Sequence, residues 1–497
     1  MKKLIIAGGG ISGLSAGIFA QAAGIHTMIL EKNRVPGGLC TGWNRYGFHI
    51  DGCIRELAGF RPDGELFRLF RLTGALEDTW LRRPPVILTV EHQGEVLQVY
   101  RDREAFLDEL TWASREDRDR IRALGELLEA AGGESLFPGM PPDLYSPGKR
   151  VLNIWEKKRF LKGAGKLEKM GGGQFREQFR SPLIRHALEM ISPEPRGALS
   201  LIRTLAALQE DGGGYPAGGS RAMVRRMEKR YGALGGTLLT GRTVTGFRMK
   251  DSRVTGVETL EGETLECDYL VTACDVHQVL YRLFRGKYPD SRLDSRLGDP
   301  GTYPLHSGLY LAAGTDAPLK QVPASLVADT EPFPAGIRQA RQLVLRHYPE
   351  EEFAPEGKSV ITGLIPTGRE ELEYWSRLRA ERPREYRRQK DRTGQGWIRA
   401  IEARYPRLKG RLMLLDVATP ATYERSVNSR HGSWTGFVPG PGARNMVHDG
   451  RLRGVDNLYM AGQWLLPPGG IPAAVLTGKW AVDRICRREK LVLPEDF

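Results

Sequence analysis

The order of apolar and polar residues at the start of the chain predicts a strand, a helix and a second strand. Residues 4–7 form an apolar run, small residues predict a helix over about 12–23, and Gly24 ends it. Residues 26–30 are again apolar enough for a buried strand. Buried strands that alternate with a helix favour a parallel α/β sheet at this end of the chain.

Two later regions show similar patterns. After a glycine-rich segment at 212–220, helix signals continue through Tyr231, and strands are expected at 236–239, 244–250, 254–258 and 269–273. Near the C-terminus, residues 457–461 predict a strand that runs into Gly462, and a helix is expected over about 471–488. Both regions therefore resemble the first in using buried strands and helices together.

Between these regions the pattern changes. Helical patterns dominate from about 60 to 205. Residues 301–440 are mixed, with strands expected near 309–312 and 360–365 and a charged helical block at 368–404. We therefore predict an α/β fold with a discontinuous first domain and an inserted α+β domain. The first domain comprises residues 1–60, 211–285 and 445–497, and the inserted one comprises residues 61–210 and 286–444.

The turn after the first strand carries a motif with a chemical role. Gly8, Gly10 and Gly13 form G-x-G-x-x-G between strand and helix, and Glu31 ends the second strand. Such glycines allow a tight turn, close backbone approach to a pyrophosphate and close helix packing, while the acid accepts hydrogen bonds from a ribose. The helix N-terminus attracts the phosphates. The motif predicts one dinucleotide site, and no second motif indicates a nicotinamide domain.

The composition is that of an ordinary soluble globular protein, with 40% hydrophobic and 27% charged residues. The uncharged run from 4 to 30 resembles a signal peptide or a membrane span, but the nucleotide motif explains its glycines better. Five cysteines without metal-binding spacing suit a reducing, cytoplasmic location and indicate no metal. The net charge of +13 comes without a nucleic-acid recognition motif, so no nucleic-acid partner is expected.

A basic segment at 149–169 interleaves lysines and arginines with apolar and aromatic residues such as Trp155 and Phe160. Such a segment can lie on an anionic bilayer, where each Lys or Arg near the surface adds about 1 kcal/mol. The alternative is a solvated helix whose apolar face packs inward. Peripheral contact with the inner face of the membrane is therefore one of two interpretations of this segment.

Three parts of the chain resemble one family. They are the N-terminal motif with Pro36-Gly37-Gly38, the stretch Tyr215-Pro216-Ala217-Gly218-Gly219, and the C-terminal stretches 457–462 and 467–472. These residues are similar to those of the phytoene desaturases, carotenoid isomerases and retinol saturases, FAD-dependent oxidoreductases of the amine-oxidase-like flavoprotein superfamily. The resemblance covers nearly the whole chain. It implies a glutathione reductase-like Rossmann domain that binds FAD, a flavin site between the domains, and an apolar substrate taken from a membrane.

The resemblance also implies which residues contact FAD. Glu31 would hold the adenosine ribose, Val244 would pair with the adenine through its backbone, and residues 470–475 would face the flavin ring. The full expected set is Gly8, Gly10, Ile11, Ser12, Gly13, Glu31, Lys32, Gly37, Gly38, Leu39, Val244, Gly462, Gln463, Gly470, Ile471 and Ala473. Two residues depart from the family pattern: Leu39 replaces a frequent Arg or Lys, and Gln463 replaces a common acid. Gln463 can still hydrogen-bond a ribityl hydroxyl, but these departures leave the identity of the substrate open.

Hydride transfer at flavin N5 needs an oriented substrate rather than a nucleophile or a metal. No catalytic residue is assigned, and the candidates are His49, Asp51, Arg55 and Trp464, each of which also has an ordinary structural explanation. Trp43 and Trp464 are candidate walls of the flavin site, and Arg425 is a candidate anchor for a substrate anion. The roles of Cys40 and Cys53 stay open.

The function expected from this resemblance is desaturation, saturation or redox-neutral isomerisation of carbon–carbon bonds in an apolar polyene or isoprenoid-like substrate. One alternative is a flavin amine oxidase, which needs a cage of two aromatic side chains at the flavin. The other is a non-catalytic lipid or prenyl carrier on the same fold, which would be expected to lose the pyrophosphate glycines or Glu31. The sequence does not give the electron partner or the oligomeric state.

Overall fold

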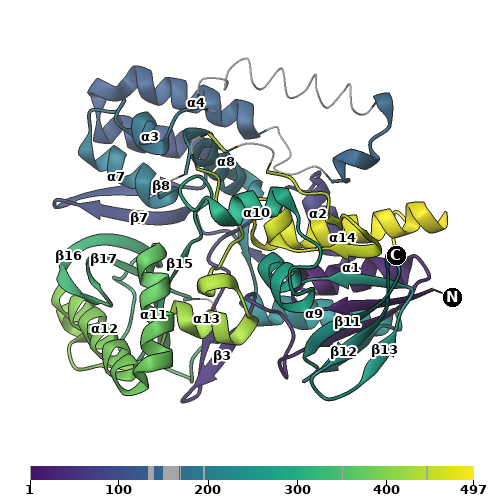
Figure 1. Ribbon diagram of the computed structural model, residues 1–497. Helices are drawn as coiled ribbons and strands as arrows, with labels where there is room; N and C mark the ends of the chain where they lie inside the picture. The colour runs from purple at the N-terminus through teal and green to yellow at the C-terminus, as the bar shows by residue number, and fades with distance from the viewer. Residues whose placement is uncertain are drawn as a thin grey trace.

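Two large sheets organise the chain (Figure 1). The computed structural model describes residues 2–132, 139–148, 167, 169–193, 196–349, 351–440, 442–443 and 446–497. The basic segment expected to contact a membrane, 149–169, lies outside the described residues except for 167 and 169. Among the described residues, no helix has the length and apolar character needed to cross a bilayer.

The six-stranded sheet collects strands from three distant parts of the chain. Its order is β10 (Thr237–Thr240), β2 (His26–Glu31), β1 (Lys3–Ala7), β14 (Tyr269–Thr272), β21 (Val455–Met460) and β20 (Arg451–Leu452). The first five strands run parallel, and β20 is antiparallel to β21. The strands expected near 4–7, 26–30, 236–239, 269–273 and 457–461 are confirmed. The predicted α/β class is confirmed for this sheet and the helices that pack on it.

Three helices pack closely beside this sheet: α1 (Ile11–Ala22), α9 (Gly219–Ala233) and α14 (Gly470–Glu489). Glycines let α1 approach the other two. A Cβ on Gly17 would lie 2.7 Å from the ring of Tyr231 in α9, and a Cβ on Gly478 in α14 would lie 2.4 Å from the carbonyl oxygen of Ser12. The small residues of α1 therefore serve close helix packing, as the sequence suggested.

A small antiparallel sheet stands beside the six-stranded one (Figure 1). It contains β11 (Val244–Lys250), β12 (Arg253–Thr259) and β13 (Thr264–Glu266). The side chain of Asn457 in β21 bridges to it, because it accepts a hydrogen bond from Val254 N at 2.8 Å and donates one to Val254 O at 2.7 Å. Helix α10 (Ser291–Gly298) follows these strands along the chain.

The seven-stranded sheet lies on the other side of the molecule. Its order is β19 (Leu412–Ala418), β15 (Ser307–Thr315), β18 (Ser359–Thr367), β17 (Arg338–His347), β16 (Ser325–Ala335), β7 (Val86–His92) and β8 (Glu95–Tyr100). Only the β16–β7 pair among these is parallel. Helices α11 (Arg369–Glu381) and α12 (Pro383–Arg404) pack against it and bury Trp375 and Trp397. The charged block at 368–404 is thus two helices, which separate at Pro383 because proline disfavours helical backbone in the residue before it.

A helical layer covers the β7–β8 end of this sheet (Figure 1). It contains α3 (Arg103–Ala113), α4 (Arg118–Gly132), α6 (Gly172–Arg176), α7 (Pro182–Ile191) and α8 (Ala198–Leu208). The expectation that helices dominate from 60 to 205 was wrong for residues 81–100, where β6 (Leu81–Arg82), β7 and β8 form. The missed signal was local: Gln93 and Gly94, with φ of +53° and +85°, make the tight turn that joins two β-branched runs.

Short ribbons connect the two large sheets. Strands β3 (Gly42–Arg45) and β4 (Phe48–Asp51) form a hairpin, and β5 (Leu57–Ala58), β9 (Gly213–Pro216) and β6 form a small antiparallel sheet. Helices α2 (Glu65–Leu72) and α13 (Pro420–Val427) complete these elements. Residues of β4, β9, β15 and α13 share one hydrophobic core with α1 and α14, which fastens both sheets to a common centre.

Candidate cofactor and substrate site

Two glycines of the G-x-G-x-x-G turn have no room for a side chain. Gly8 has a φ of +109°, and a Cβ there would lie 2.7 Å from the carbonyl oxygen of Ala273, just after β14. A Cβ on Gly13 would lie 1.9 Å from the carbonyl oxygen of Gly8. Both glycines are therefore needed to carry β1 directly into α1.

The backbone around Gly10 is open. The nearest atoms to a Cβ on Gly10 are Gly37 O and Gly38 Cα, both at 3.9 Å. The Gly37 N–H donates to Gly9 O at 2.8 Å, which holds the second pair of glycines against the first turn. The expected cofactor segments 8–13 and 37–38 are therefore side by side, with little but backbone between them.

The C-terminal segment closes this group of glycines from another side. Gly462 has a φ of +130°, and the nearest atom to a Cβ there would be Ser12 Oγ at 3.8 Å. Its N–H donates a hydrogen bond to Thr477 Oγ1 at 2.9 Å. Three glycine segments thus surround one space with backbone, and we call them the glycine cradle. Such a cradle has the form that a pyrophosphate requires.

Two helices begin at or beside the cradle with glycine at the N-cap. Gly10 precedes α1 and Gly469 precedes α14, so neither N-cap residue has a side chain to cap its helix. Ile471 and Ala473 in the first turn of α14 are buried. Helix N-termini without caps carry about half a positive charge and attract phosphates and other anions.

Glu31 is 5% exposed and lies directly beside the first glycine turn. Its carboxylate accepts hydrogen bonds from Gly9 N at 2.8 Å and from the backbone and side-chain N–H groups of Asn33 at 2.8 and 2.9 Å. Its carbonyl oxygen accepts from Arg242 N at 2.9 Å, which brings the start of β11 and the half-buried Val244 to the same end of the sheet. The acid is therefore held where a ribose-binding acid is needed.

Lys32, another residue of the expected cofactor set, links two segments. Its ammonium donates to Arg425 O at 2.9 Å and to Asn428 Oδ1 at 2.7 Å, and burial lowers its pKa. The side chain thus fastens α13 to the end of β2. Leu39, the neighbour of the paired glycines, packs against the shared hydrophobic core.

Gln463 connects two loops by its side-chain amide. Its Oε1 accepts from Gly470 N at 3.2 Å, and its Nε2 donates to Trp434 O at 3.0 Å. The amide thus positions the first residue of α14 relative to the loop that carries Trp434. An acid at this position could not donate to the carbonyl oxygen of Trp434, which gives the departure from the family pattern a structural reason.

Asp51 is fully buried and ties four segments together. Oδ2 accepts from Tyr215 Oη at 2.5 Å and Ser220 N at 2.9 Å, while Oδ1 accepts from Cys53 N at 3.2 Å and from Ser220 Oγ. Its carbonyl oxygen accepts from the hydroxyl of Tyr310 in β15. The carboxylate therefore joins β4, β9 and the start of α9, and it raises the pKa of Tyr215 together with burial, the larger cause.

The other catalytic candidates lie in different surroundings. The ring of His49 contacts Asn44 Oδ1 at 2.8 Å and packs 4.9 Å from Phe353, and burial lowers its pKa. Trp464 packs edge-on to Phe437 at 5.0 Å, in a core apart from the one that includes Trp43. Trp43 and Trp464 thus pack with different hydrophobic cores, and their role as walls of the flavin site stays a prediction.

Four aromatic residues belong to or pack against the shared hydrophobic core, and we call Trp43, Tyr310, Tyr423 and Trp434 the aromatic group. Gln463, the neighbour of Gly462 in the cradle, is linked to this group by its hydrogen bond to Trp434 O. Trp43 lies 6.2 Å from Tyr310, and Tyr423 lies 5.7 Å from Trp434, both edge-on. Trp43 also donates to Asp416 Oδ2 at 3.1 Å. The group comes from β3, β15, α13 and the loop fixed by Gln463, so only the fold brings it together.

Two half-buried arginines lie beside this group. The guanidinium of Arg346 sits 5.2 Å from the ring centres of both Tyr215 and Tyr348 and donates to the carbonyl oxygen of Arg55. Burial lowers the pKa of Arg55. Arg55 Nη1 and the Tyr348 hydroxyl have no hydrogen-bond partner among the described residues. Because burying unpaired charge is costly, the surroundings of Arg55 and Tyr348 favour a negatively polarised group. No local pattern along the chain points to Arg346 or Tyr348.

Comparison with known proteins identifies the family. A family model described as flavin containing amine oxidoreductase matches residues 11–486. The chain belongs to this family. It is accordingly an FAD-dependent oxidoreductase, and the glycine cradle, Glu31 and the uncapped helix N-termini fit that cofactor.

Other members of the family align with nearly the whole chain. A phytoene desaturase (lycopene-forming) of Pseudescherichia vulneris is 24% identical, with 96% of this chain and 98% of the relative covered. Prolycopene isomerase 2 of an Oncidium hybrid is 23% identical, with 97% and 83% covered. Among solved structures, an oxidoreductase from Methanosarcina mazei has a TM-score of 0.61 at 14% identity, with 97% and 100% covered. A putrescine oxidase variant also reaches 0.61 at 14%, with 98% and 99% covered. These structures support the fold.

Proposed function

We propose that this oxidoreductase acts on carbon–carbon bonds of an apolar polyene or isoprenoid-like substrate, by desaturation, saturation or redox-neutral isomerisation. The full-length similarity to relatives named phytoene desaturase and prolycopene isomerase supports this class of substrate. In the structure, the aromatic group next to the glycine cradle is the observation that carries the proposal. Its rings offer an apolar surface close to where a flavin is expected.

FAD, when bound, supplies hydride transfer at N5 of its flavin ring, and the protein binds and orients the substrate. We infer that Gly10, Gly37 and Gly462 surround the pyrophosphate and that Glu31 holds the ribose. The N-terminus of α14 would lie at the flavin ring, where its dipole favours negative charge by about 0.3–1 kcal/mol. The remaining expected residues of the cofactor set stay predictions.

The division into domains is part of the same proposal. Residues 1–60, 211–285 and 445–497 would form the FAD-binding domain, since every strand of the six-stranded sheet comes from these segments. Residues 61–210 and 286–444 would form the substrate-binding domain, since they supply every strand of the seven-stranded sheet. The aromatic group then takes members from both parts.

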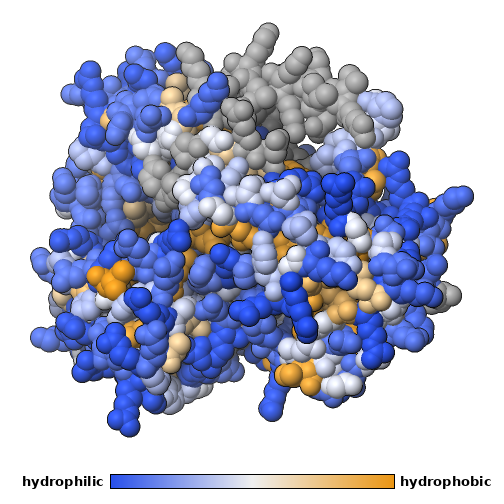
Figure 2. All heavy atoms as spheres, viewed as in Figure 1, coloured by the Kyte–Doolittle hydropathy of each residue, from blue (hydrophilic) through white to orange (hydrophobic). Residues whose placement is uncertain are grey.

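The surface drawn in Figure 2 supports an apolar ligand. Its periphery is mainly hydrophilic, while hydrophobic residues gather in a band through its centre, between the two large parts of the molecule. Apolar surface that lies in a band between two parts of a protein is typical of a ligand or partner contact.

The two alternatives make different demands. A cationic amine would be repelled by the half-buried Arg55 and Arg346, and the two aromatic pairs stand edge-on rather than face to face as a cage requires. A carrier without flavin chemistry would not need the complete cradle with Glu31. We therefore rank the polyene oxidoreductase above both.

The test is spectroscopic and uses the purified holoprotein. Flavin absorption is bleached anaerobically with dithionite, and a hydrocarbon polyene, a polyene carboxylate or a primary amine is then added, with products separated by chromatography. Return of the absorption with a polyene indicates saturation, and a polyene consumed by the oxidised protein indicates desaturation. A changed double-bond geometry without net reduction indicates isomerisation. Bleaching of the oxidised protein by the amine alone would refute the proposal, and a colourless protein that cannot take up FAD would favour the carrier.

A further inference from the structure

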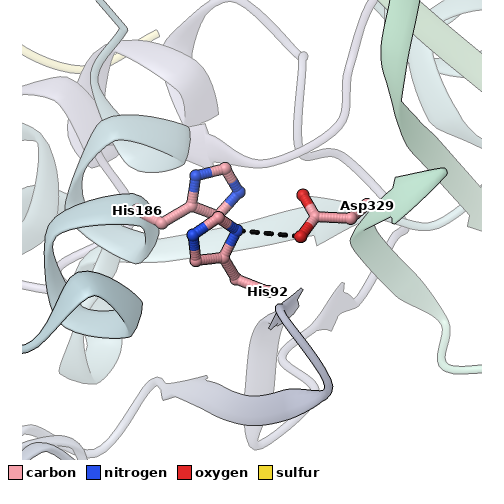
Figure 3. Close-up of side chains that lie close together, drawn as sticks. All are labelled: His92, His186 and Asp329. Carbon is pink, nitrogen blue, oxygen red and sulfur yellow. Dashed lines mark hydrogen bonds and ion pairs between the residues drawn. The ribbon is translucent and has the colours of Figure 1, made fainter. Parts of the chain in front are cut away.

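Two histidines and an aspartate meet at the β7–β8 end of the seven-stranded sheet (Figure 3). Asp329 Oδ2 lies 2.9 Å from His92 Nδ1, and the ring of His186 stacks on that of His92 at 4.2 Å with 16° between the planes. One ligand atom from each of the three side chains lies within 4.8 Å of the other two. We call these residues the His–His–Asp cluster.

Strand register places two members of the cluster. β7 and β16 run parallel with Ala328 opposite Glu91, so Asp329 and His92 follow as the next pair. A bulge in β16 begins after Asp329, and His92 is the last residue of β7 before the tight turn. Bulges and strand ends are places where a side chain is turned away from the regular sheet.

The third member comes from the helical layer. His186 lies on α7, whose neighbouring residues Leu183, Ile184, Ala187 and Leu188 are buried against β7 and β8. The packing of α7 therefore fixes where the imidazole points, and Figure 3 shows it approaching the strand residues from the helix. Glu189 follows three positions later, so a second carboxylate stands on the same side of the helix.

We propose that His92, His186 and Asp329 bind a divalent transition-metal ion, of which Zn2+ fits best. Two imidazoles and one carboxylate are a ligand set that Zn2+ accepts, with water in the fourth position. Tetrahedral bonds of about 2.0–2.1 Å place ligand atoms roughly 3.3 Å apart. His92 Nδ1 and Asp329 Oδ2, 2.9 Å apart, have to separate slightly, and one of the two stacked imidazoles has to turn, because an imidazole binds a metal in the plane of its ring. Side-chain exposures of 21% for His92 and 45% for Asp329 leave a path for the ion.

The surroundings orient the cluster. Gln93 N donates to Asp329 Oδ2 at 2.9 Å, and the side-chain amide of Gln342 lies 3.4 Å from His186 Nε2. Gln342 stands opposite Asp329 in the β16–β17 register. Hydrogen bonds of this kind hold metal ligands in place around many metal sites. A bound ion would fasten α7 to two strands of the sheet, and this inference does not depend on the proposed enzymatic function.

The experiment measures Zn2+ binding by the FAD-loaded full chain after removal of metals with a chelator. Affinity is determined by competition with a chromophoric chelator, and Co2+ is added separately because its visible absorption reports tetrahedral coordination. The variants are His186→Ala and Asp329→Asn. The matched control is His26→Ala, since His26 is exposed on β2 in the other sheet. Far-UV circular dichroism and retained FAD show that each variant folds.

We expect one Zn2+ per chain in the parent protein and in His26→Ala. Each cluster variant should bind at least about 10–100-fold more weakly, the loss that even an outer hydrogen-bond partner causes. Equal Zn2+ affinity in the parent and in folded His186→Ala, or no stoichiometric binding in the parent, would overturn the proposal and leave the cluster as a stacked pair with one hydrogen bond. An octahedral Co2+ spectrum would overturn the assignment to a tetrahedral site.

Discussion

Replacing Asp51 by Asn tests the interpretation of this residue as a structural centre. Each carboxylate oxygen accepts one backbone N–H, from Ser220 on one side and Cys53 on the other, plus one hydroxyl. An asparagine side chain replaces one of the two carboxylate oxygens by an NH2 group, which then faces one backbone N–H and one hydroxyl. Whichever way the amide turns, one backbone N–H therefore loses its acceptor, because a hydroxyl can reverse its direction and an N–H cannot.

The structure sets the size of the effect. An unpaired buried donor costs about 1–3 kcal/mol, and the remaining bonds weaken because their acceptor has lost its charge, so Asp51→Asn should destabilise the protein by roughly 2–5 kcal/mol. The assay is chemical unfolding followed by flavin fluorescence and circular dichroism. Tyr215→Phe removes one hydroxyl only and should cost less, about 1.5–3 kcal/mol. Asp63→Asn, at an 82% exposed side chain, is the matched control and should change little.

Two results would refute this reasoning. If Asp51→Asn unfolds within about 0.5 kcal/mol of the parent, the range expected for ordinary surface substitutions, the four hydrogen bonds do not hold the centre together. If it folds equally well but loses turnover with an altered pH profile, Asp51 acts as an acid or base, as the sequence left open. Loss of stability with turnover retained per folded molecule would support the structural role.

Four further outcomes follow from the geometry. Glu31→Gln should weaken FAD binding roughly 10–150-fold, as expected for a lost charge-assisted bond, in a fluorescence titration of the apoprotein; an unchanged Kd would contradict the ribose assignment. Arg55→Gln should raise KM for a polyene carboxylate by about tenfold or more relative to a hydrocarbon polyene, and equal changes for both would argue against an anion site. Burial lowers the pKa of His306 to about 4 from 6.5, so between these two pH values the folded state binds fewer protons than the unfolded state. The stability of the protein therefore falls as the pH drops from 6.5 to 4. His306→Gln should make the unfolding midpoint depend less on pH between pH 4 and 7. The β3–β4 register has Gly42 opposite Asp51 and, continued by two residues, sets Cys40 opposite Cys53. Diamide, which takes up the two thiol hydrogens, should therefore join these cysteines and remove two free thiols in the parent. Cys53→Ser should form no such crosslink.

The nucleotide part of the fold was predictable because its signals are local. Short apolar runs mark β1, β2, β14 and β21, and β11 has the predicted bounds, Val244–Lys250. Every side chain of a central parallel strand is buried, so the run is continuous and visible in the sequence. The motif glycines likewise act through their own backbone, and the structure shows the lack of space at Gly8 and Gly13 directly.

Much of the seven-stranded sheet was not predictable for the opposite reason. β16 contains Pro332 and Pro334, which argue against a strand, and the sheet accepts them where the register of β16 shifts between Asp329 and Phe333. β17 mixes polar and apolar residues without strict alternation, over a surface that is only partly buried. Its identity as a strand depends on neighbours that lie far away in the sequence, and no local pattern contains that information.

The same distinction separates the sites. The expected cofactor residues sit on local glycine segments that are visible in the sequence, whereas Arg346 reaches Arg55 only through the pairing of distant elements. The expectation of no metal rested on cysteine spacing, which describes sites carried by one loop or hairpin. His92 and Asp329 become neighbours through the parallel β7–β16 register, and that register was itself hidden because β7 and β16 were not recognised as strands. A cluster built by tertiary pairing leaves no spacing signature, so it can be found only after the sheet is known.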